Sequence, residues 1–138
     1  MRHTILKVKF CSSQMHSSEE TVSQKPISVI SVGGYIEFTT SDELDKVIEA
    51  LVKTKSYNII VDLENVDYIS SRGWSKFLSK IKEIRENEGD LKLIKMTPDV
   101  LEVFKVLKFF WFLSVYDTIE EAISDFDHGV PPLLGGGQ

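Results

Sequence analysis

Apolar and polar residues along this chain follow two spacings, that of strands and that of helices. Leu6 to Phe10 alternates with a period of two, which is typical of a half-buried edge strand. Residues 27–32 repeat this pattern and are followed by Gly33 and Gly34, a pair that predicts a turn. We expect these two strands to form a hairpin.

Four later segments have apolar residues at helical intervals and polar residues on the opposite side. Each begins with residues that can cap a helix or start its first turn. We expect the second helix to end near residues 87–89. The predicted starts are Thr40 with Glu43, Ser70 with Ser71, Thr97 with Pro98, and Thr118 with Glu121.

Three further strands are predicted between these helices. Asn58 to Leu63 is a nearly continuous run of apolar, mainly β-branched residues, as expected for a central strand covered on both faces. Residues 91–96 and 112–116 supply the others. Strands alternating with helices after an opening hairpin predict an α/β fold, with a mixed, mainly parallel sheet of four to five strands and about four helices packed on it.

We expect one domain over residues 1–129. With 42% hydrophobic residues among 138, the chain can bury a core without disulfides or metal. Residues 11–25 are rich in Ser, Gln, Glu and Thr and predict a mobile loop insertion. Residues 130–138 lack periodicity and predict a loose tail.

Charge and cysteine content narrow the class of partner. A net charge of -5 argues against binding nucleic acid or an anionic membrane, because such proteins need surplus Lys and Arg. Cys11 is the single cysteine, so no intramolecular disulfide or structural zinc site is expected. The chain shows no apolar run of signal-peptide or membrane-span length. We therefore expect a cytoplasmic protein with a protein or small-molecule partner.

Motifs for enzymatic chemistry are absent from the sequence. It contains neither a Gly-x-x-x-x-Gly-Lys loop nor a Gly-x-Gly-x-x-Gly loop. An enzyme that hydrolyses nucleotides would therefore lack its usual phosphate-binding loop. His3, His16 and His128 fall in the predicted termini and mobile loop. We expect them to be solvated side chains and not metal ligands or catalytic bases. A hydrolytic triad needs a rigidly held histidine. We expect no enzyme, no cofactor and no metal.

Two clusters allow both a structural and a functional interpretation. Asp62, Glu64 and Asp67 either hold magnesium or cap the strand end and face solvent, and we favour the second. The aromatic run over 109–112 either packs at a helix-to-strand junction or, where exposed, forms a sticky partner patch. Here we favour packing.

The run from Asp67 to Trp74 is the strongest candidate for function. We expect a loop over residues 64–73 at the carboxyl end of the central strand, where functional sites of such sheets gather. Ser70 or Ser71 there can cap the helix by accepting a bond from a free amide. Either can instead accept a phosphoryl group, whose charge of about -1.5 to -2 is tolerated beside a helix N-terminus.

Four segments occur in an order and spacing that resemble a known family. Over residues 27–126 the chain resembles the STAS domains, and among them the bacterial anti-sigma factor antagonists. The resemblance implies a binding module, not an enzyme. Its unphosphorylated form would bind an anti-sigma factor that is also a serine kinase, and this binding would release a sigma factor. Phosphorylation by the kinase would end the binding. A PP2C-like phosphatase would remove the phosphate and restore the binding. The segments are Val32 to Ile36, Ile59 to Leu63, Val66 to Gly73 and Val115 to Ala122.

The resemblance also implies which serine accepts the phosphoryl group. The family's loop commonly reads Asp-Ser-Ser-Gly or Asp-Ser-Thr-Gly, so anchoring on Gly73 places Ser71 at the acceptor position, with Ser70 as the alternative. Ser70 stands where the family has aspartate, Arg72 replaces the next Ser or Thr, and Ser75 replaces a common second glycine. Arg72 can pair with a phosphate and weaken the repulsion on which the switch depends.

Residues flanking the acceptor are expected to form the partner surface, since aromatic and arginine side chains often anchor interfaces. These are Tyr68, Ser70, Arg72, Gly73 and Trp74.

Two other functions stay open. One is a STAS scaffold that binds its partner whether or not it is phosphorylated, with the serines serving only as caps. The other, much less favoured, is a small nucleotide-binding protein using Asp62, Asp67 and Ser71.

Overall fold

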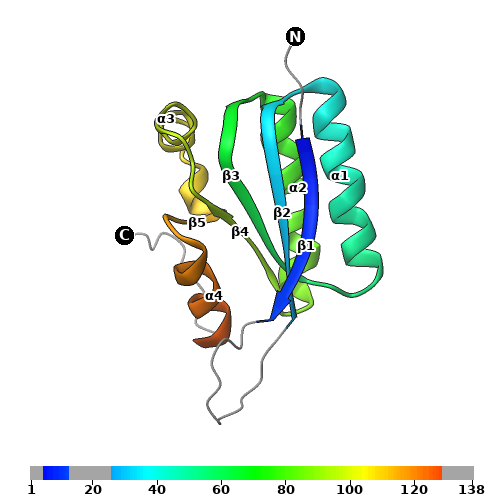
Figure 1. Cartoon of the computed structure of the whole chain (residues 1–138). Helices are drawn as coiled ribbons and strands as arrows, with labels where there is room; N and C mark the ends of the chain where they lie inside the picture. The colour runs from blue at the N-terminus through cyan, green and yellow to red at the C-terminus, as the bar shows by residue number, and fades with distance from the viewer. Residues whose placement is uncertain (1–4, 13–25, 129–138) are drawn as a thin grey trace.

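The computed structural model describes residues 5–12 and 26–128, and in this part of the chain the strands form one five-stranded sheet (Figure 1). Strand order follows chain order, with β1 antiparallel to β2 and the other neighbours parallel. The predicted hairpin and mainly parallel sheet are therefore confirmed. The elements are β1 (Ile5–Ser12), β2 (Pro26–Ile36), α1 (Phe38–Lys53), β3 (Asn58–Ile69), α2 (Ser71–Glu86), β4 (Asp90–Ile94), α3 (Pro98–Val106), the short 3-10 helix η1 (Phe109–Trp111), β5 (Ser114–Tyr116) and α4 (Ile119–His128).

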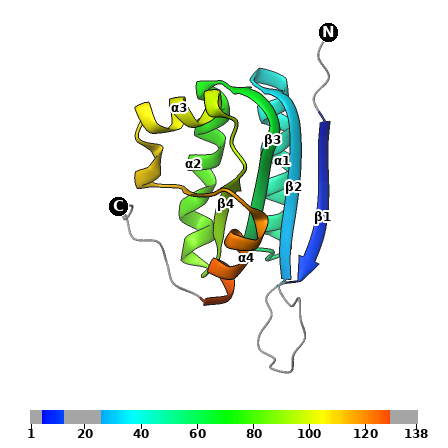
Figure 2. The same cartoon turned by 60° about the vertical axis from the view of Figure 1, so that its left-hand side comes forward.

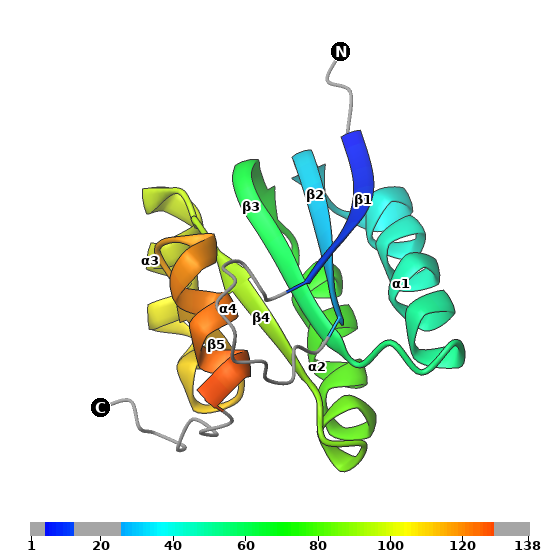
Figure 3. The same cartoon turned by 60° about the horizontal axis from the view of Figure 1, so that its bottom comes forward.

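Helices lie on both faces of the sheet. α1 and α2 cover one face and α4 lies against the other, as Figures 2 and 3 show from two sides. The larger core cluster joins the sheet to α1, α2 and α3 through residues such as Ile48, Phe77 and Phe104. A smaller cluster packs Ala122 and Phe126 of α4 on the opposite face. The α/β layering predicted from the hydrophobic pattern is thus observed.

The strand before the serines is longer than predicted. β3 runs to Ile69 and pairs with β2 as far as Ile36, whereas its pairing with β4 ends at Asp62. Val66 and Ile69 are buried in this extension, while the residues between them face solvent. The predicted loop over 64–73 is therefore wrong, because Ser70 alone lies between strand and helix.

Gly33 and Gly34 lie inside β2 instead of ending it. The pairing of β2 with β3 shifts register on either side of them, as at a β-bulge. Gly34 has a φ of 93°, in the left-handed region that favours glycine. The turn predicted here is wrong: the glycines let β2 bend and continue beside the extension of β3.

The first helix begins earlier than its predicted cap. α1 starts at Phe38, and Thr40 lies within its first turn. The Thr40 Oγ1 atom accepts a hydrogen bond from the Glu37 amide at 2.8 Å and donates one to the Tyr35 carbonyl at 2.8 Å. Thr40 thus ties the helix start to the end of β2, and its predicted pairing with Glu43 as a capping box is wrong.

The starts of the last two long helices agree with prediction. Thr97 caps α3 by accepting from the Val100 amide, and Pro98 takes the first helical position. Thr118 accepts from the Glu121 amide at 3.1 Å ahead of α4. The predicted loop over 11–25 and tail over 130–138 lie outside the described residues, apart from the end of β1 at positions 11 and 12.

A buried ionic network attaches α4 to the sheet. Lys92 of β4 is only 2% exposed, and its ammonium group donates to Asp90 at 2.9 Å and to Asp125 of α4 at 3.2 Å. The Tyr116 hydroxyl donates to the same Asp125 carboxylate. The Lys92 charge also lies 4.6 Å from the ring centroid of Phe126. Because each charge in this network has partners, α4 is held by polar contacts as well as by packing.

Tyr116→Phe is expected to flatten the loss of stability at alkaline pH. Burial, together with the bond to Asp125, raises the pKa of Tyr116 above its ordinary 10.0. A raised pKa gives stability that is full below about pH 10 and is lost as pH rises further, since the folded state then holds a proton that the unfolded state releases. Urea unfolding from pH 8 to 11 should show a steeper fall for the wild type. An equal fall in the free energy of unfolding for Tyr116→Phe and the wild type would show that the Tyr116 hydroxyl does not cause the alkaline loss of stability.

Candidate functional site

Ser70 is the cap of α2. Its side-chain oxygen accepts a hydrogen bond from the Gly73 amide at 3.1 Å, and its own amide donates to the Ile36 carbonyl at 2.9 Å. The first bond satisfies a free amide of the helix start, and the second joins that start to the end of β2. The structural interpretation of the serine pair therefore applies to Ser70.

Ser71 occupies the first helical position and is exposed. Its hydroxyl makes no hydrogen bond to another described residue. Free amides and the positive end of the helix dipole surround this position, so added negative charge is tolerated there. Of the two serines, Ser71 is the more exposed, and its hydroxyl is not engaged as the cap.

Gly73 is needed for close packing beneath the serines. A Cβ atom at this position would lie 2.8 Å from Ile36 Cγ2, 2.9 Å from Ile69 Cγ2 and 3.2 Å from the Ile36 carbonyl oxygen. Distances this short are below ordinary van der Waals contact. The glycine lets α2 start directly against the ends of β2 and β3, which places Ser71 at the carboxyl end of the central strand.

Gly73→Ala is expected to lower the free energy of unfolding by about 1 to 3 kcal/mol, the usual cost of overpacking a tight site. Urea denaturation of the two proteins measures this directly. Ser75→Ala is the matched control, because Ser75 is exposed in the same turn and its change should stay within about 0.5 kcal/mol. Equal stability of Gly73→Ala and wild type would show that the contact is not tight.

Arg72 has partners on α1 already. Its guanidinium lies 3.4 Å from an Asp42 carboxylate oxygen and 4.6 Å from the centroid of the Phe38 ring. The side chains of Arg72 and Asp42 are 47% and 43% exposed, so this ion pair adds little stability. It does set where the arginine lies next to Ser71. Sequence reasoning missed both Asp42 and Phe38.

A ladder of ion pairs continues this contact between α1 and α2. Lys76 lies 3.6 Å from Asp42 and 3.9 Å from Asp45, while Lys80 lies 3.5 Å from Asp45 and 2.6 Å from Glu49. The bond from Lys80 lowers the pKa of Glu49, and the same bond raises the pKa of Lys80. Acidic residues at helical spacing on one helix and basic ones on the next were the available sequence signal.

Trp74 lies in the core. It is 2% exposed, and its ring centroid lies 6.1 Å from that of Phe77, 5.9 Å from Phe104 and 4.9 Å from Phe109. Gly73 is buried as well. The prediction that these two residues belong to the partner surface is therefore wrong. Both lie beneath it, and Trp74 links the start of α2 to α3 and η1.

Tyr68 is exposed and so is available to the predicted partner surface. Its side chain is 49% exposed and packs edge to face with Tyr35, with 6.0 Å between ring centroids. Phe38, at the start of α1, is 64% exposed beneath the Arg72 guanidinium. We use the name serine surface for the accessible residues around the start of α2: Phe38, Tyr68, Ser71 and Arg72.

The acidic cluster before the serines does not gather into a metal site. Asp62 accepts a hydrogen bond from the Glu64 amide at 3.0 Å, and the Glu64 carboxylate lies 3.8 Å from Lys95. Among the described residues no three His, Cys, Asp or Glu side chains are grouped so that they could hold a metal ion. The Asp62 contact agrees with the favoured interpretation, in which Asp62 bonds backbone amides at the strand end; Glu64 and Asp67 are exposed.

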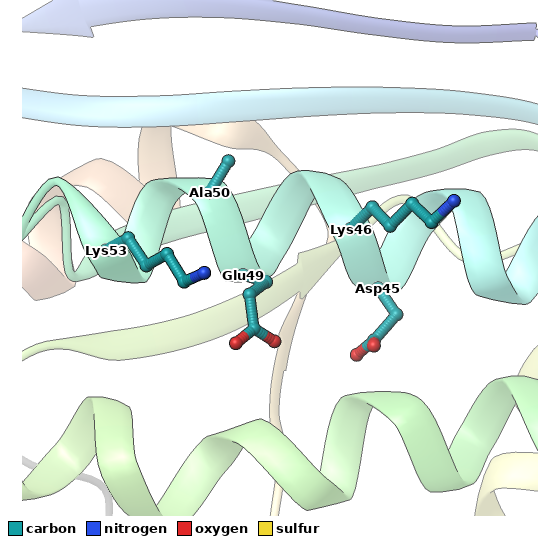
Figure 4. A pocket seen from close by; sticks show the side chains of 5 residues that line it. All are labelled: Asp45, Lys46, Glu49, Ala50 and Lys53. Atoms are coloured by element: carbon teal, nitrogen blue, oxygen red, sulfur yellow. The ribbon is translucent and has the colours of Figure 1, made fainter.

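A hollow along α1 is separate from this site. Its lining comes entirely from one helix (Figure 4), and two of its carboxylates, Asp45 and Glu49, pair with lysines of α2. The hollow is lined by Asp45, Lys46, Glu49, Ala50 and Lys53.

No helix in the described part of the chain has the length and apolar character to cross a membrane.

Comparison with known proteins assigns the family. A model described as STAS domain matches residues 19–122. The chain is 30% identical to the Bordetella bronchiseptica protein BtrV over 98 residues, which cover 71% of this chain and 84% of BtrV. It is 27% identical over 92 residues to the Staphylococcus aureus anti-sigma-B factor antagonist, covering 67% of this chain and 85% of that protein.

Solved structures agree on the fold. One match is the unphosphorylated form of Bacillus SpoIIAA, an anti-sigma factor antagonist. Its TM-score is 0.60 at 20% identity, and the match covers 88% of this chain and 100% of SpoIIAA. The chain belongs to the STAS domain family, and within it is similar to anti-sigma factor antagonists. The resemblance predicted from the sequence is confirmed.

Proposed function

We propose that this chain is a regulatory binding module whose unmodified form binds an anti-sigma factor with serine kinase activity and thereby frees a sigma factor. Phosphorylation of Ser71 ends the complex, and a PP2C-like phosphatase restores it. The chain itself performs no catalysis and acts in the cytoplasm, where the kinase has ATP. The observation that carries the proposal is an exposed Ser71 hydroxyl at a helix N-terminus. It makes no hydrogen bond to a described residue and lies beside a Ser70 hydroxyl already used as the cap.

The relatives support this role. One of them is named an anti-sigma-B factor antagonist. The structural relative SpoIIAA has been solved in phosphorylated and unphosphorylated forms, so the shared fold accommodates a phosphoryl group. In this chain, a phosphate on Ser71 adds charge at a helix start that tolerates it, so the domain stays folded while its surface changes.

The surroundings of Ser71 favour a switch by repulsion. Asp42 holds the Arg72 guanidinium at 3.4 Å, so this carboxylate competes with a phosphate on Ser71 for the adjacent arginine. A partner closing over the serine surface would desolvate the phosphate's negative charge without a dedicated partner for it. Tyr68, Phe38 and Arg72 supply the aromatic and arginine contacts for the unmodified complex.

Incubation with the candidate kinase and ATP, followed by peptide mass spectrometry, tests the proposal. We expect one phosphate on Ser71, its loss in Ser71→Ala, and its retention in Ser70→Ala despite a cap loss of about 1 kcal/mol. A phosphate on Ser70 would reverse the assignment. Absence of phosphate, with partner binding intact, would support the constitutive scaffold instead.

A further inference from the structure

An exposed apolar patch covers α3 and η1. Six large hydrophobic side chains within ten residues of sequence are more than one-third exposed. A monomeric domain rarely exposes so many neighbouring apolar side chains unless they bind something. We call them the α3–η1 patch: Val103 at 39%, Val106 at 68%, Leu107 at 49%, Phe110 at 41%, Trp111 at 49% and Phe112 at 54%.

The patch is built on a packed support. Phe104 is 3% exposed beneath it, and its ring centroid lies 6.4 Å from that of Phe110, which lies 5.7 Å from Trp111. Lys108 adopts a left-handed conformation with a φ of 59°, which turns the chain from α3 into η1. The Trp111 amide then donates to the Lys108 carbonyl at 3.2 Å. The exposed rings are therefore held in a defined arrangement.

Charges of both signs border the patch. Lys105 and Lys108 are exposed among its residues, and Asp99 and Glu102 are exposed one turn earlier on α3. Neither lysine has an ion-pair partner within the described residues. The chemistry that complements the part of the patch around these two lysines is an apolar helix face or groove flanked by carboxylates.

The patch adjoins the serine surface. Trp74 lies in the first turn of α2, three residues after Ser71, and packs on Phe104 and Phe109 beneath the patch. The start of α2 and all of α3 lie at the same end of the sheet, where β2, β3 and β4 have their carboxyl ends (Figures 1 and 2). A standard interface covers about 800 Å² on each partner, roughly 30 Å across. Ser71 and the patch thus lie at one end of the molecule, where a single partner can contact both.

We infer that the α3–η1 patch is the second half of the surface that binds the partner proposed above, an inference that rests on that proposed function. The two halves act differently. The serine surface carries the phosphorylation-sensitive part of the affinity. The patch supplies an apolar anchor, flanked by Lys105 and Lys108, that phosphorylation of Ser71 leaves intact.

The test measures Kd for the anti-sigma factor in a set of variants of the full chain. Trp111→Ser and Phe112→Ser should each raise Kd roughly 10- to 100-fold, as expected for an aromatic anchor. The ratio of Kd between Ser71→Asp and its parent should stay the same with and without Trp111→Ser. Lys46→Ala, an exposed change on α1, is the matched control and should leave Kd unchanged.

The outcomes separate this inference from the proposed function. If Ser71→Asp weakens binding and both patch variants bind like wild type, the patch inference is overturned and the function stands. If the wild type does not bind the anti-sigma factor, the function fails and the inference falls with it. Two further measurements test other occupants of the patch. Analytical sedimentation measures self-association, and flotation with phosphatidylglycerol and phosphatidylethanolamine vesicles measures lipid binding. Self-association or vesicle binding that Trp111→Ser abolishes, with Kd for the partner unchanged, would assign the patch to a second copy or a lipid surface.

Discussion

Ser71→Asp, or phosphoserine at position 71, is expected to lower the affinity for the anti-sigma factor by about 30-fold to several thousand-fold. This range corresponds to roughly 2 to 5 kcal/mol, the cost of burying a charge that has no prepared partner across an interface. Ser71 is exposed at the first position of α2, and the adjacent Arg72 is already paired with Asp42. Titration calorimetry with the purified partner measures the change.

Controls separate charge at Ser71 from a folding defect or a general effect of charge. Ser71→Ala should bind like wild type, because the hydroxyl makes no bond to a described residue. Ser75→Asp places the same charge at an exposed position one turn later and should change Kd far less. Thermal unfolding of Ser71→Asp should match the wild type or exceed it, since aspartate is favoured in a first helical turn. Equal affinity of Ser71→Asp and Ser71→Ala would contradict the switch.

Trp74→Ala is expected to lower the free energy of unfolding by about 3 to 5 kcal/mol, the usual cost of truncating a buried tryptophan. Trp74 is 2% exposed and contacts the rings of Phe77, Phe104 and Phe109. Removing it leaves a cavity where α2, α3 and η1 meet. Urea denaturation, with two-state fits on several probes, gives the change.

A conservative variant and a surface tryptophan sharpen this test. The Trp74 indole N–H is buried and has no hydrogen-bond partner among the described residues. Trp74→Phe removes that donor together with part of the ring, so its cost should be well below that of Trp74→Ala. Trp111→Ala changes a half-exposed tryptophan and should cost clearly less stability than Trp74→Ala. Similar losses for Trp74→Ala and Trp111→Ala would contradict the assignment of Trp74 to the core.

The layered architecture was predictable because each element carries its own periodic pattern. The apolar run after Asn58 predicts a central strand, and β3 occupies that position. Its extension to Ile69 was not predictable from the pattern, because the extension pairs with β2 alone and only two of its side chains, Val66 and Ile69, are buried. Short runs of mixed polar residues have no strand period, so long-range pairing decides their conformation.

The site was predictable only in part. Two adjacent serines can each cap a helix, and the residue that does so depends on where the preceding strand ends, which required the structure. In the sequence, Trp74 precedes Phe77 by three residues, which is the spacing of one helix face, so its assignment to the partner surface overlooked that signal. The contacts of Arg72 with Asp42 and Phe38 join residues about 30 positions apart. No local pattern specifies such a pair.

The most direct measurement is the release of a sigma factor from its complex with the anti-sigma factor. A fluorescently labelled sigma factor is held in that complex, and the chain is added either unmodified or phosphorylated at Ser71. We predict that the unmodified chain releases the sigma factor and that the phosphorylated chain does not at the same concentration. Equal release by both forms, or release by neither, would contradict the account.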